Sequence, residues 1–132
     1  MISTGNREPL VKFYEDVFEK KVDEMMGWLV GNVYFGIMDH SEINGKSKEP
    51  ARIMINIESD DVVADFDRIS NIEGAEVVKK PYQMTMDGGT VNEGEETEDG
   101  FWIATLADPD GNYFQLMSPW SADDFKDNQT SN

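Results

Sequence analysis

Cysteine is absent from the 132 residues of this chain, which excludes disulfide bonds, zinc sites built from thiolates and a cysteine nucleophile. The sequence also lacks an apolar run of about 20 residues, the length that a membrane-spanning helix needs. Residues 1–7 lack the basic start and the apolar centre of a signal peptide, so the sequence predicts a cytoplasmic protein.

Basic residues are scarce: 11 Lys and Arg stand against 27 Asp and Glu, and the net charge is −16. Nucleic acids and anionic membrane surfaces both attract basic proteins, so we expect neither as a partner. The sequence does contain a hydrophobic fraction of 39% and an aromatic fraction of 11%, which indicates a folded, acidic protein. Its length fits one domain, predicted over residues 1–120 and followed by a polar tail at residues 121–132.

Two amphipathic segments predict helices, one over residues 8–18 and one that follows Ser59-Asp60-Asp61 and runs to about Ile72. The sequence Ser59-Asp60-Asp61 supplies an N-cap for the second helix, and Gly74 follows it where a C-terminal cap belongs. Both segments carry apolar residues at three- and four-residue spacing. The expected buried stripes are Leu10, Phe13, Tyr14, Val17 and Phe18 in the first helix and Val62, Val63, Phe66 and Ile69 in the second.

Alternating apolar residues predict strands around these helices. Residues 101–117 contain two apolar arms joined by the turn sequence Asp108-Pro109-Asp110-Gly111-Asn112, which predicts a hairpin. Residues 52–58 carry Ile at every second position and predict a strand with one apolar face. The other expected strands are residues 20–26, 28–30, 33–39 and 75–79, the last of which is expected to end at Pro81.

The predicted elements form one pattern twice, in residues 1–45 and in residues 51–120. The order and spacing resemble the vicinal oxygen chelate superfamily, which includes glyoxalase I, bleomycin resistance proteins and extradiol dioxygenases, and the chain is similar to its small single-domain, glyoxalase-like members. The resemblance implies an α+β fold in which two β-α-β-β-β modules form a cup-shaped mixed sheet, here with a truncated first strand. It also implies a homodimer. The stretches that carry it are Phe13-Tyr14-Glu15-Asp16-Val17-Phe18, Asp60-Asp61-Val62 leading to Glu73-Gly74-Ala75-Glu76-Val77-Val78, and the hairpin from Ala104-Thr105 to Leu116.

Metal-dependent members of this superfamily place His or Glu on four strands that face the cup. The resemblance places the corresponding positions at Gln115, at Arg52, near Gly36 and before Met1. A divalent ion prefers carboxylate or neutral imidazole, whereas Gln offers only a neutral oxygen and Arg stays cationic. We therefore expect no metal cofactor. The alternative is a divalent ion held by shifted acids or by His40, the only histidine.

The same resemblance predicts a ligand-binding face. Arg52, Met54 and Asn56 share one face of their predicted strand; Arg52 could clamp an anion, and Gln115 could orient a ligand carbonyl. The structural alternatives are an ion pair between Arg52 and an acidic neighbour, and amides of Asn56 and Gln115 that are satisfied within the sheet. Aromatic side chains either line the pocket or form the core or a dimer interface; those concerned are Tyr34, Trp102, Tyr113, Trp28 and Trp120.

The function favoured by these expectations is the binding of a small organic molecule in a cup-shaped cavity without the usual metal centre. The first alternative is a metal-dependent lyase, isomerase or dioxygenase-like enzyme that acts on a small oxo compound. The second is a pure interaction module. Whether the chain is an enzyme stays open; if it is one, the resemblance implies a lyase or isomerase of the glyoxalase type. No serine nucleophile elbow, P-loop or Rossmann glycine pattern occurs in the sequence.

Overall fold

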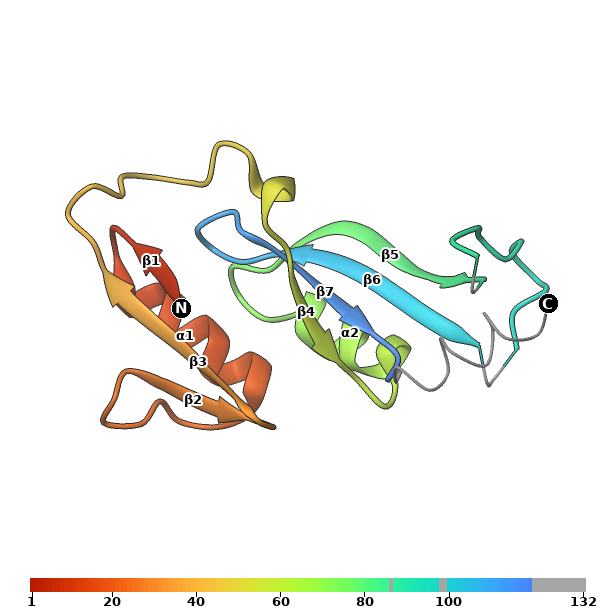
Figure 1. Cartoon of the computed structure of the whole chain (residues 1–132), viewed down its shortest axis with the longest axis horizontal. Helices are drawn as coiled ribbons and strands as arrows, with labels where there is room; N and C mark the ends of the chain where they lie inside the picture. The colour runs from red at the N-terminus through yellow and green to blue at the C-terminus, as the bar shows by residue number, and fades with distance from the viewer. Residues whose placement is uncertain (86, 98–99, 120–132) are drawn as a thin grey trace.

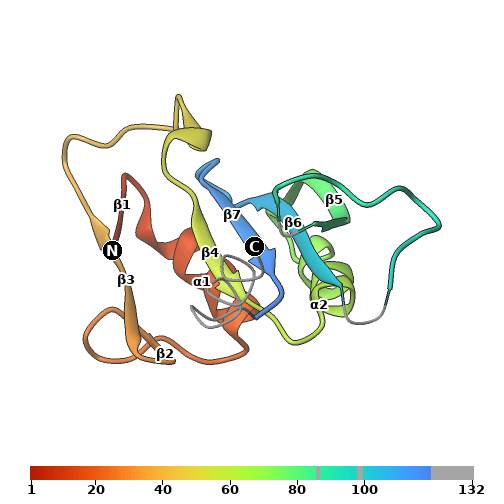
Figure 2. The same cartoon turned by 45° about the vertical axis from the view of Figure 1, so that its right-hand side comes forward.

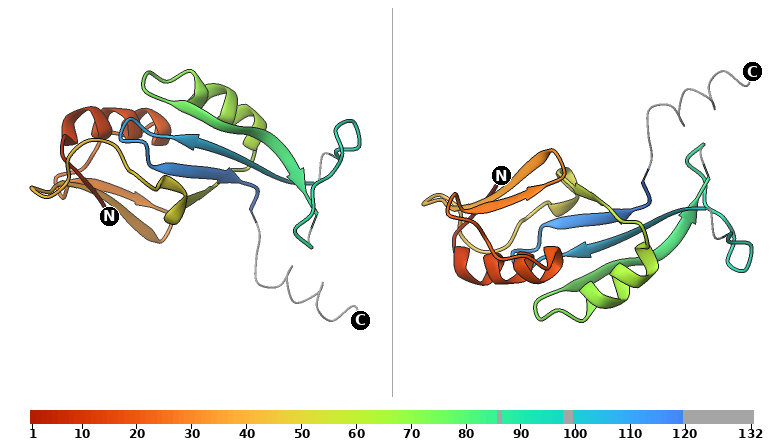
Figure 3. Two further views of the ribbon diagram at one scale, coloured as in Figure 1. Left: turned by 90° about the horizontal axis from the view of Figure 1, so that it is seen from above. Right: turned by 90° about the horizontal axis from the view of Figure 1, so that it is seen from below.

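The computed structural model describes residues 1–85, 87–97 and 100–119. Two helices lie on the same side of two β-sheets (Figures 1 and 3). Among the described residues, no helix has the length and apolar character to cross a bilayer. The elements in chain order are β1 (Ile2–Thr4), α1 (Arg7–Phe18), β2 (Gly27–Val30), β3 (Val33–Asp39), the 3-10 helix η1 (Pro50–Arg52), β4 (Ile55–Glu58), α2 (Val62–Ser70), β5 (Glu76–Met84), β6 (Phe101–Ala107) and β7 (Tyr113–Met117).

Both sheets are mixed. The first has the strand order β1-β3-β2 and the second the order β4-β7-β6-β5, and in each of them the strand before the helix pairs in parallel with the last strand of its module. β1 and β2 are thus the edges of the first sheet and β4 and β5 those of the second, and Figure 2 shows β4 on the side of its sheet that faces the first module. The predicted α+β class is confirmed, and the short first strand is present as β1.

The core lies between the helices and the sheets. The predicted stripe of α1 is confirmed, since Leu10, Phe13, Tyr14 and Val17 are each 5% exposed or less. The rings of Phe13 and Phe114 meet edge to face with their centroids 6.0 Å apart. A helix of the first module therefore packs on a strand of the second, and the two modules share one core.

The second helix begins as predicted, because the Asp61 side chain accepts a hydrogen bond from the Ala64 N–H at 3.1 Å. Val63 is 42% exposed, so its predicted place in the buried stripe is wrong. It follows Val62 by one residue, which turns its side chain by about 100° around the helix axis. The buried residues of α2 are Val62, Phe66 and Ile69.

The exit from α2 also differs from the prediction. The helix ends at Ser70 and its C-cap is Asn71, so Gly74 is not the cap. Gly74 lies in the following turn with φ +95°, and a Cβ at this position would lie 2.9 Å from Cγ of Pro109. Glycine is needed here because the turn requires positive φ and approaches the hairpin loop closely.

The strand predicted over residues 20–26 is wrong. Asp23 Oδ1 accepts hydrogen bonds from the N–H groups of Met25 at 2.8 Å and Gly27 at 3.2 Å. A carboxylate that bonds the backbone two and four residues ahead favours a turn over a strand. The first module therefore has three strands, whereas the second has the four that the pattern predicts.

Two further strand boundaries are corrected. The strand predicted from Arg52 begins only at Ile55, because Pro50–Arg52 forms η1. The strand expected to end at Pro81 continues to Met84, with irregular pairing to β6 between Val77 and Tyr82. Proline is tolerated there because β5 is an edge strand with a local irregularity.

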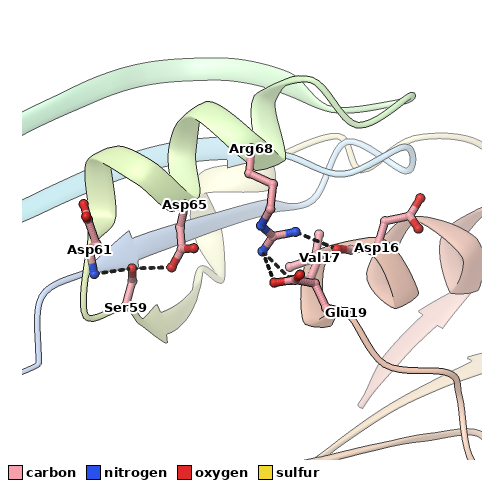
Figure 4. Close-up of polar contacts among 7 residues, drawn as sticks. All are labelled: Asp16, Val17, Glu19, Ser59, Asp61, Asp65 and Arg68. Atoms are coloured by element: carbon pink, nitrogen blue, oxygen red, sulfur yellow. Dashed lines mark hydrogen bonds and ion pairs between the residues drawn. The ribbon is translucent and has the colours of Figure 1, made fainter.

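Arg68 of α2 joins the two modules at the end of α1 (Figure 4). Its Nη1 donates to the carbonyl of Asp16 at 2.8 Å and its Nη2 to the carbonyl of Val17 at 2.9 Å. The Nη2 also lies 3.5 Å from Oε1 of Glu19. The last carbonyls of a helix have no partner within it, so Arg68 caps α1 from the neighbouring module.

A second junction joins α1 and β1 to the hairpin loop. The Tyr14 hydroxyl donates to Asp108 Oδ2 at 2.7 Å in the interior, and the Thr4 hydroxyl donates to Asp110 Oδ2 at 2.5 Å. The predicted turn is confirmed, with the Gly111 N–H donating to the Asp108 carbonyl at 2.8 Å. The turn thus shapes the hairpin and attaches it to the first module.

Candidate functional site

The helix-free face of the four-stranded sheet carries a row of polar side chains that crosses its strands. Strand pairing places Asn56 of β4 opposite Gln115 of β7, Gln115 opposite Thr105 of β6, and Thr105 opposite Lys79 of β5. Neighbouring residues Phe114 and Leu116 are buried in the core, so the alternation of a strand directs Gln115 to the other face. We call these four residues, Asn56, Gln115, Thr105 and Lys79, the polar row.

One amide of the polar row is held in place by its neighbour. Gln115 Nε2 donates to Thr105 Oγ1 at 3.3 Å, and Thr105 is only 6% exposed. Among the described residues, Gln115 Oε1 accepts no hydrogen bond and the exposed Asn56 side chain makes none. The row therefore offers an oriented amide oxygen and a second amide that are open to a ligand.

Apolar and aromatic side chains flank the polar row. Tyr113 and Met117 lie two residues on either side of Gln115 on β7, and both are partly buried. Met54 precedes β4, two residues before Asn56, and is 40% exposed. This combination suits a small molecule that accepts or donates a hydrogen bond near its centre and packs apolar groups on both sides.

Arg52 does not belong to this face. It ends η1, outside β4, and its Nη2 lies 2.7 Å from Oε2 of Glu49, with both side chains largely exposed. The ion pair with an acidic neighbour, which the sequence left as the structural alternative, is the arrangement found. The placement of Arg52 beside Asn56 on one strand face is wrong, because the strand begins three residues later.

The aromatic candidates are divided between different surfaces. Trp102 lies three residues before Thr105 on β6, so its side chain points to the opposite face of the sheet. There it packs against the core on the helix side, near the start of α2. Tyr34 lies on β3 of the other sheet and donates its hydroxyl to Asp23 Oδ1 at 2.6 Å. Loss of solvation and this hydrogen bond raise the pKa of Tyr34 to about 12. Trp28 is 1% exposed in the core, and Trp120 lies outside the described residues.

The residues at the predicted metal-ligand positions do not match the His and Glu ligands that the resemblance implies. Gln115 contributes an amide, Gly36 has no side chain, and the guanidinium of Arg52 bonds Glu49. His40 accepts the Glu42 N–H through Nδ1 at 3.1 Å on an exposed loop. Among the described residues, no three His, Cys, Asp or Glu side chains are grouped closely enough to hold an ion.

The sequence interpretation missed Thr105 and Lys79. A signal for Thr105 exists, because strands that leave a short hairpin loop pair symmetrically around it and so bring Thr105 opposite Gln115. Lys79 carries no such signal, since the pairing of β5 with β6 shifts on both sides of it.

A cleft lies elsewhere, along α1. Its volume is about 1190 Å³, and its lining mixes both charge signs, with Arg7, Lys12 and Lys21 beside Glu15 and Asp39. Lys21 pairs with Glu15 at 3.8 Å, and the Arg7 N–H bonds Asp39. Of the residues that line this cleft, Lys21 and Glu15 form an ion pair, and none of the polar row lines it.

Comparison with known proteins finds solved structures with a similar fold. No protein-family model and no curated protein matches the sequence. Among solved structures, a glyoxalase/bleomycin resistance protein from Albidiferax ferrireducens T118 aligns with a TM-score of 0.65 at 14% identity, over 90% of this chain and 95% of that one. A glyoxalase/bleomycin resistance protein/dioxygenase family enzyme from Burkholderia phytofirmans PsJN aligns at 0.59 and 21% identity, over 89% and 93%.

A glyoxalase I mutant from Zea mays aligns with a TM-score of 0.57 at 18% identity, over 90% of this chain and 43% of its own. This chain therefore spans less than half the length of that glyoxalase I. The fold is that of the glyoxalase/bleomycin resistance proteins, and the resemblance seen in the sequence is confirmed at the level of the fold.

Proposed function

We propose that this protein binds a small organic molecule on the helix-free face of its four-stranded sheet, through the polar row and without a metal ion. The observation that carries the proposal is the Gln115 amide, which Thr105 holds in place at 3.3 Å while its oxygen stays open. A polar group that is oriented before the ligand arrives loses less conformational entropy on binding. Bleomycin resistance and glyoxalase proteins of the same fold support a role in small-molecule binding.

The side chains indicate the chemical class of the ligand. Asn56, Gln115 and Thr105 are neutral and match carbonyl, hydroxyl or amide groups. The fourth member of the row, Lys79, places its Nζ 4.4 Å from the centroid of the Tyr82 ring. Tyr113 and Met117 offer an aromatic ring and a thioether for apolar contact. A net charge of −16 repels anions over the whole surface. We therefore propose a neutral ligand that combines one carbonyl or hydroxyl group with an apolar body.

The donor chemistry supports binding without a metal. An amide oxygen and a hydroxyl are neutral donors, and they bind a divalent ion less strongly than carboxylate or imidazole. Gln115 donates its Nε2 to Thr105, so the neutral Oε1 is the one atom of this amide that could ligate an ion. In this proposal the neutral members of the polar row, Asn56, Gln115 and Thr105, bind and orient the ligand.

Thermal unfolding with a panel of neutral cyclic amides, phenols and oxo compounds, in the presence of a chelator, tests the proposal. A compound that binds the native state at 100 times its Kd adds about 2.7 kcal/mol to the free energy of unfolding. We expect at least one such compound, with its stabilisation lost in Gln115→Leu and kept in the control Arg52→Leu. Stabilisation that needs a divalent ion, or that survives in both Gln115→Leu and Asn56→Leu, would contradict it.

A further inference from the structure

The orientation of the Gln115 amide depends on its neighbour across the sheet. A primary amide has an oxygen that accepts hydrogen bonds and an NH₂ group that donates them, and an unrestrained Gln side chain turns either end toward a partner. Gln115 is partly buried on β7, and strand pairing places Thr105 of β6 directly opposite it. The Thr105 hydroxyl therefore lies where it can favour one of the two orientations.

One orientation is found. Gln115 Nε2 donates to Thr105 Oγ1 at 3.3 Å, and among the described residues Gln115 Oε1 accepts no hydrogen bond. Thr105 is only 6% exposed, and shielding from water strengthens a hydrogen bond. One hydrogen of Nε2 is thus engaged, whereas both lone pairs of Oε1 are open. Toward a ligand, this amide acts mainly as an acceptor.

Asn56 supplies the complementary group. It lies opposite Gln115 on β4, and neighbouring strands are about 4.8 Å apart. Its exposed side chain makes no hydrogen bond among the described residues, so this amide is free to turn its NH₂ group toward a ligand. A ligand hydroxyl about 2.8 Å from both side chains fits the spacing. It donates to Gln115 and accepts from Asn56.

We propose that this face prefers ligands that carry a hydrogen-bond donor, with phenols and alcohols as the simplest class, and that Thr105 fixes the preference. The inference rests on the proposed function and narrows its ligand class. A ketone or an ether brings only lone pairs to Gln115 Oε1, and two acceptors repel one another. Thr105 is a positioning residue, because it acts on the ligand through the amide that it orients.

Two isomeric compounds test the preference. Para-ethylphenol has a hydroxyl donor, whereas para-methylanisole has an ether oxygen that only accepts. Nuclear magnetic resonance titration of the ¹⁵N-labelled full chain gives the Kd of each compound from the backbone signals of Tyr113 and Met117. We expect the phenol to bind the wild type about tenfold more tightly, because the ether leaves Oε1 without a partner. In Gln115→Leu the ratio of the two Kd values should fall close to one.

Variants of Thr105 test its positioning role. Thr105→Val keeps the shape of the side chain but removes the oxygen that holds Nε2, so Gln115 becomes free to turn its NH₂ group toward the ether. We expect the ratio of the two Kd values to fall to about two or less. Thr105→Ser retains the hydroxyl and should restore most of the preference. A purely structural role of Thr105 would change both Kd values by the same factor and leave their ratio unchanged.

The possible outcomes separate this inference from the proposed function. If both isomers bind equally well and both lose affinity in Gln115→Leu, the proposed function stands and the donor preference is overturned. Tighter binding of the ether, or a ratio that Thr105→Val leaves unchanged, would also overturn the inference. If neither isomer shifts the signals of this face, the result counts against the proposed function and the inference together. The ratios for the wild type and Gln115→Leu decide the question even if Thr105→Val does not fold.

Discussion

Asp108 shows how one carboxylate connects local turn chemistry with the tertiary structure. It is 3% exposed, and its Oδ1 accepts the N–H groups of Asp110 at 2.9 Å and Asn112 at 3.0 Å. Burial raises the pKa of Asp108 above its ordinary value, and hydrogen bonds from Tyr14 and Asn112 lower it by less. Asp108 therefore binds a proton more readily in the folded than in the unfolded protein.

The shifted pKa of Asp108 predicts a pH dependence of stability. Because the pKa is higher in the folded state, the contribution of Asp108 to stability is fully present below its unfolded pKa of about 4 and is lost as the pH rises through the folded pKa. Urea unfolding of the wild type and of Asp108→Asn between about pH 4 and pH 7 measures this. We expect the wild type to lose stability relative to the variant as the pH rises. The assignment would be contradicted if the difference in free energy of unfolding between the wild type and Asp108→Asn stayed constant, or if the wild type gained stability relative to the variant as the pH rises.

The buried hydroxyl of Tyr14 gives a second prediction for the same junction. Tyr14→Phe removes the donor to Asp108 Oδ2 and leaves a buried carboxylate oxygen with one partner fewer. We expect a loss of about 1–3 kcal/mol in the free energy of unfolding. Tyr34→Phe is the matched control, because it removes a hydroxyl that bonds an exposed Asp23. Chemical denaturation should show a smaller loss for the control, and equal losses would argue against the junction.

The residue-scale predictions from sequence succeeded where local chemistry decides. Gln115 lies on an open face as alternation predicts, and the turn around Gly111 forms as its residue types indicate. Arg52 was misplaced because Pro50 starts a 3-10 turn that delays β4. The burial of Asp108 depends on Tyr14, which lies 94 positions away in the sequence, so no local pattern contains it.

At the scale of elements, Arg68 predicts how strongly the two helices depend on each other. Arg68→Ala leaves the last carbonyls of α1, at Asp16 and Val17, without their donor. We expect a loss of about 1–3 kcal/mol in the free energy of unfolding, because these hydrogen bonds come from a charged donor.

The control for Arg68→Ala is Arg52→Ala, whose ion pair with Glu49 is exposed. It should change the free energy of unfolding by less than about 1 kcal/mol. Denaturant midpoints of the two variants make the comparison. Similar midpoints would show that Arg68 does not act as an inter-module cap.

Both helices and the final hairpin were predictable, because each has an apolar stripe or a turn sequence of its own. Residues 20–26 were predicted as a strand, since neither their composition nor their spacing shows that Asp23 bonds the backbone ahead of it. The end of β5 was missed for a related reason. Pro81 normally ends a strand, but at a sheet edge it costs no ladder hydrogen bond.

At the scale of the whole molecule, the two sheets differ in the surfaces they present. The four-stranded sheet presents the Gln115 amide between Tyr113 and Met117, and the three-stranded sheet presents exposed apolar side chains such as Leu29 and Val33. Arg68 and the contacts of Tyr14 and Thr4 hold the modules together. The proposed ligand binding belongs to the larger sheet.

The measurement that tests the central claim most directly is a nuclear magnetic resonance titration of the ¹⁵N-labelled protein. The probe is the neutral compound with the largest thermal stabilisation, added in the presence of a chelator. We predict that the side-chain amide signals of Asn56 and Gln115 and the backbone signals of Tyr113 and Met117 shift most, and that Gln115→Leu abolishes the effect. Shifts that centre on the α1 cleft around Arg7, or that appear only when a divalent ion is added, would contradict the claim.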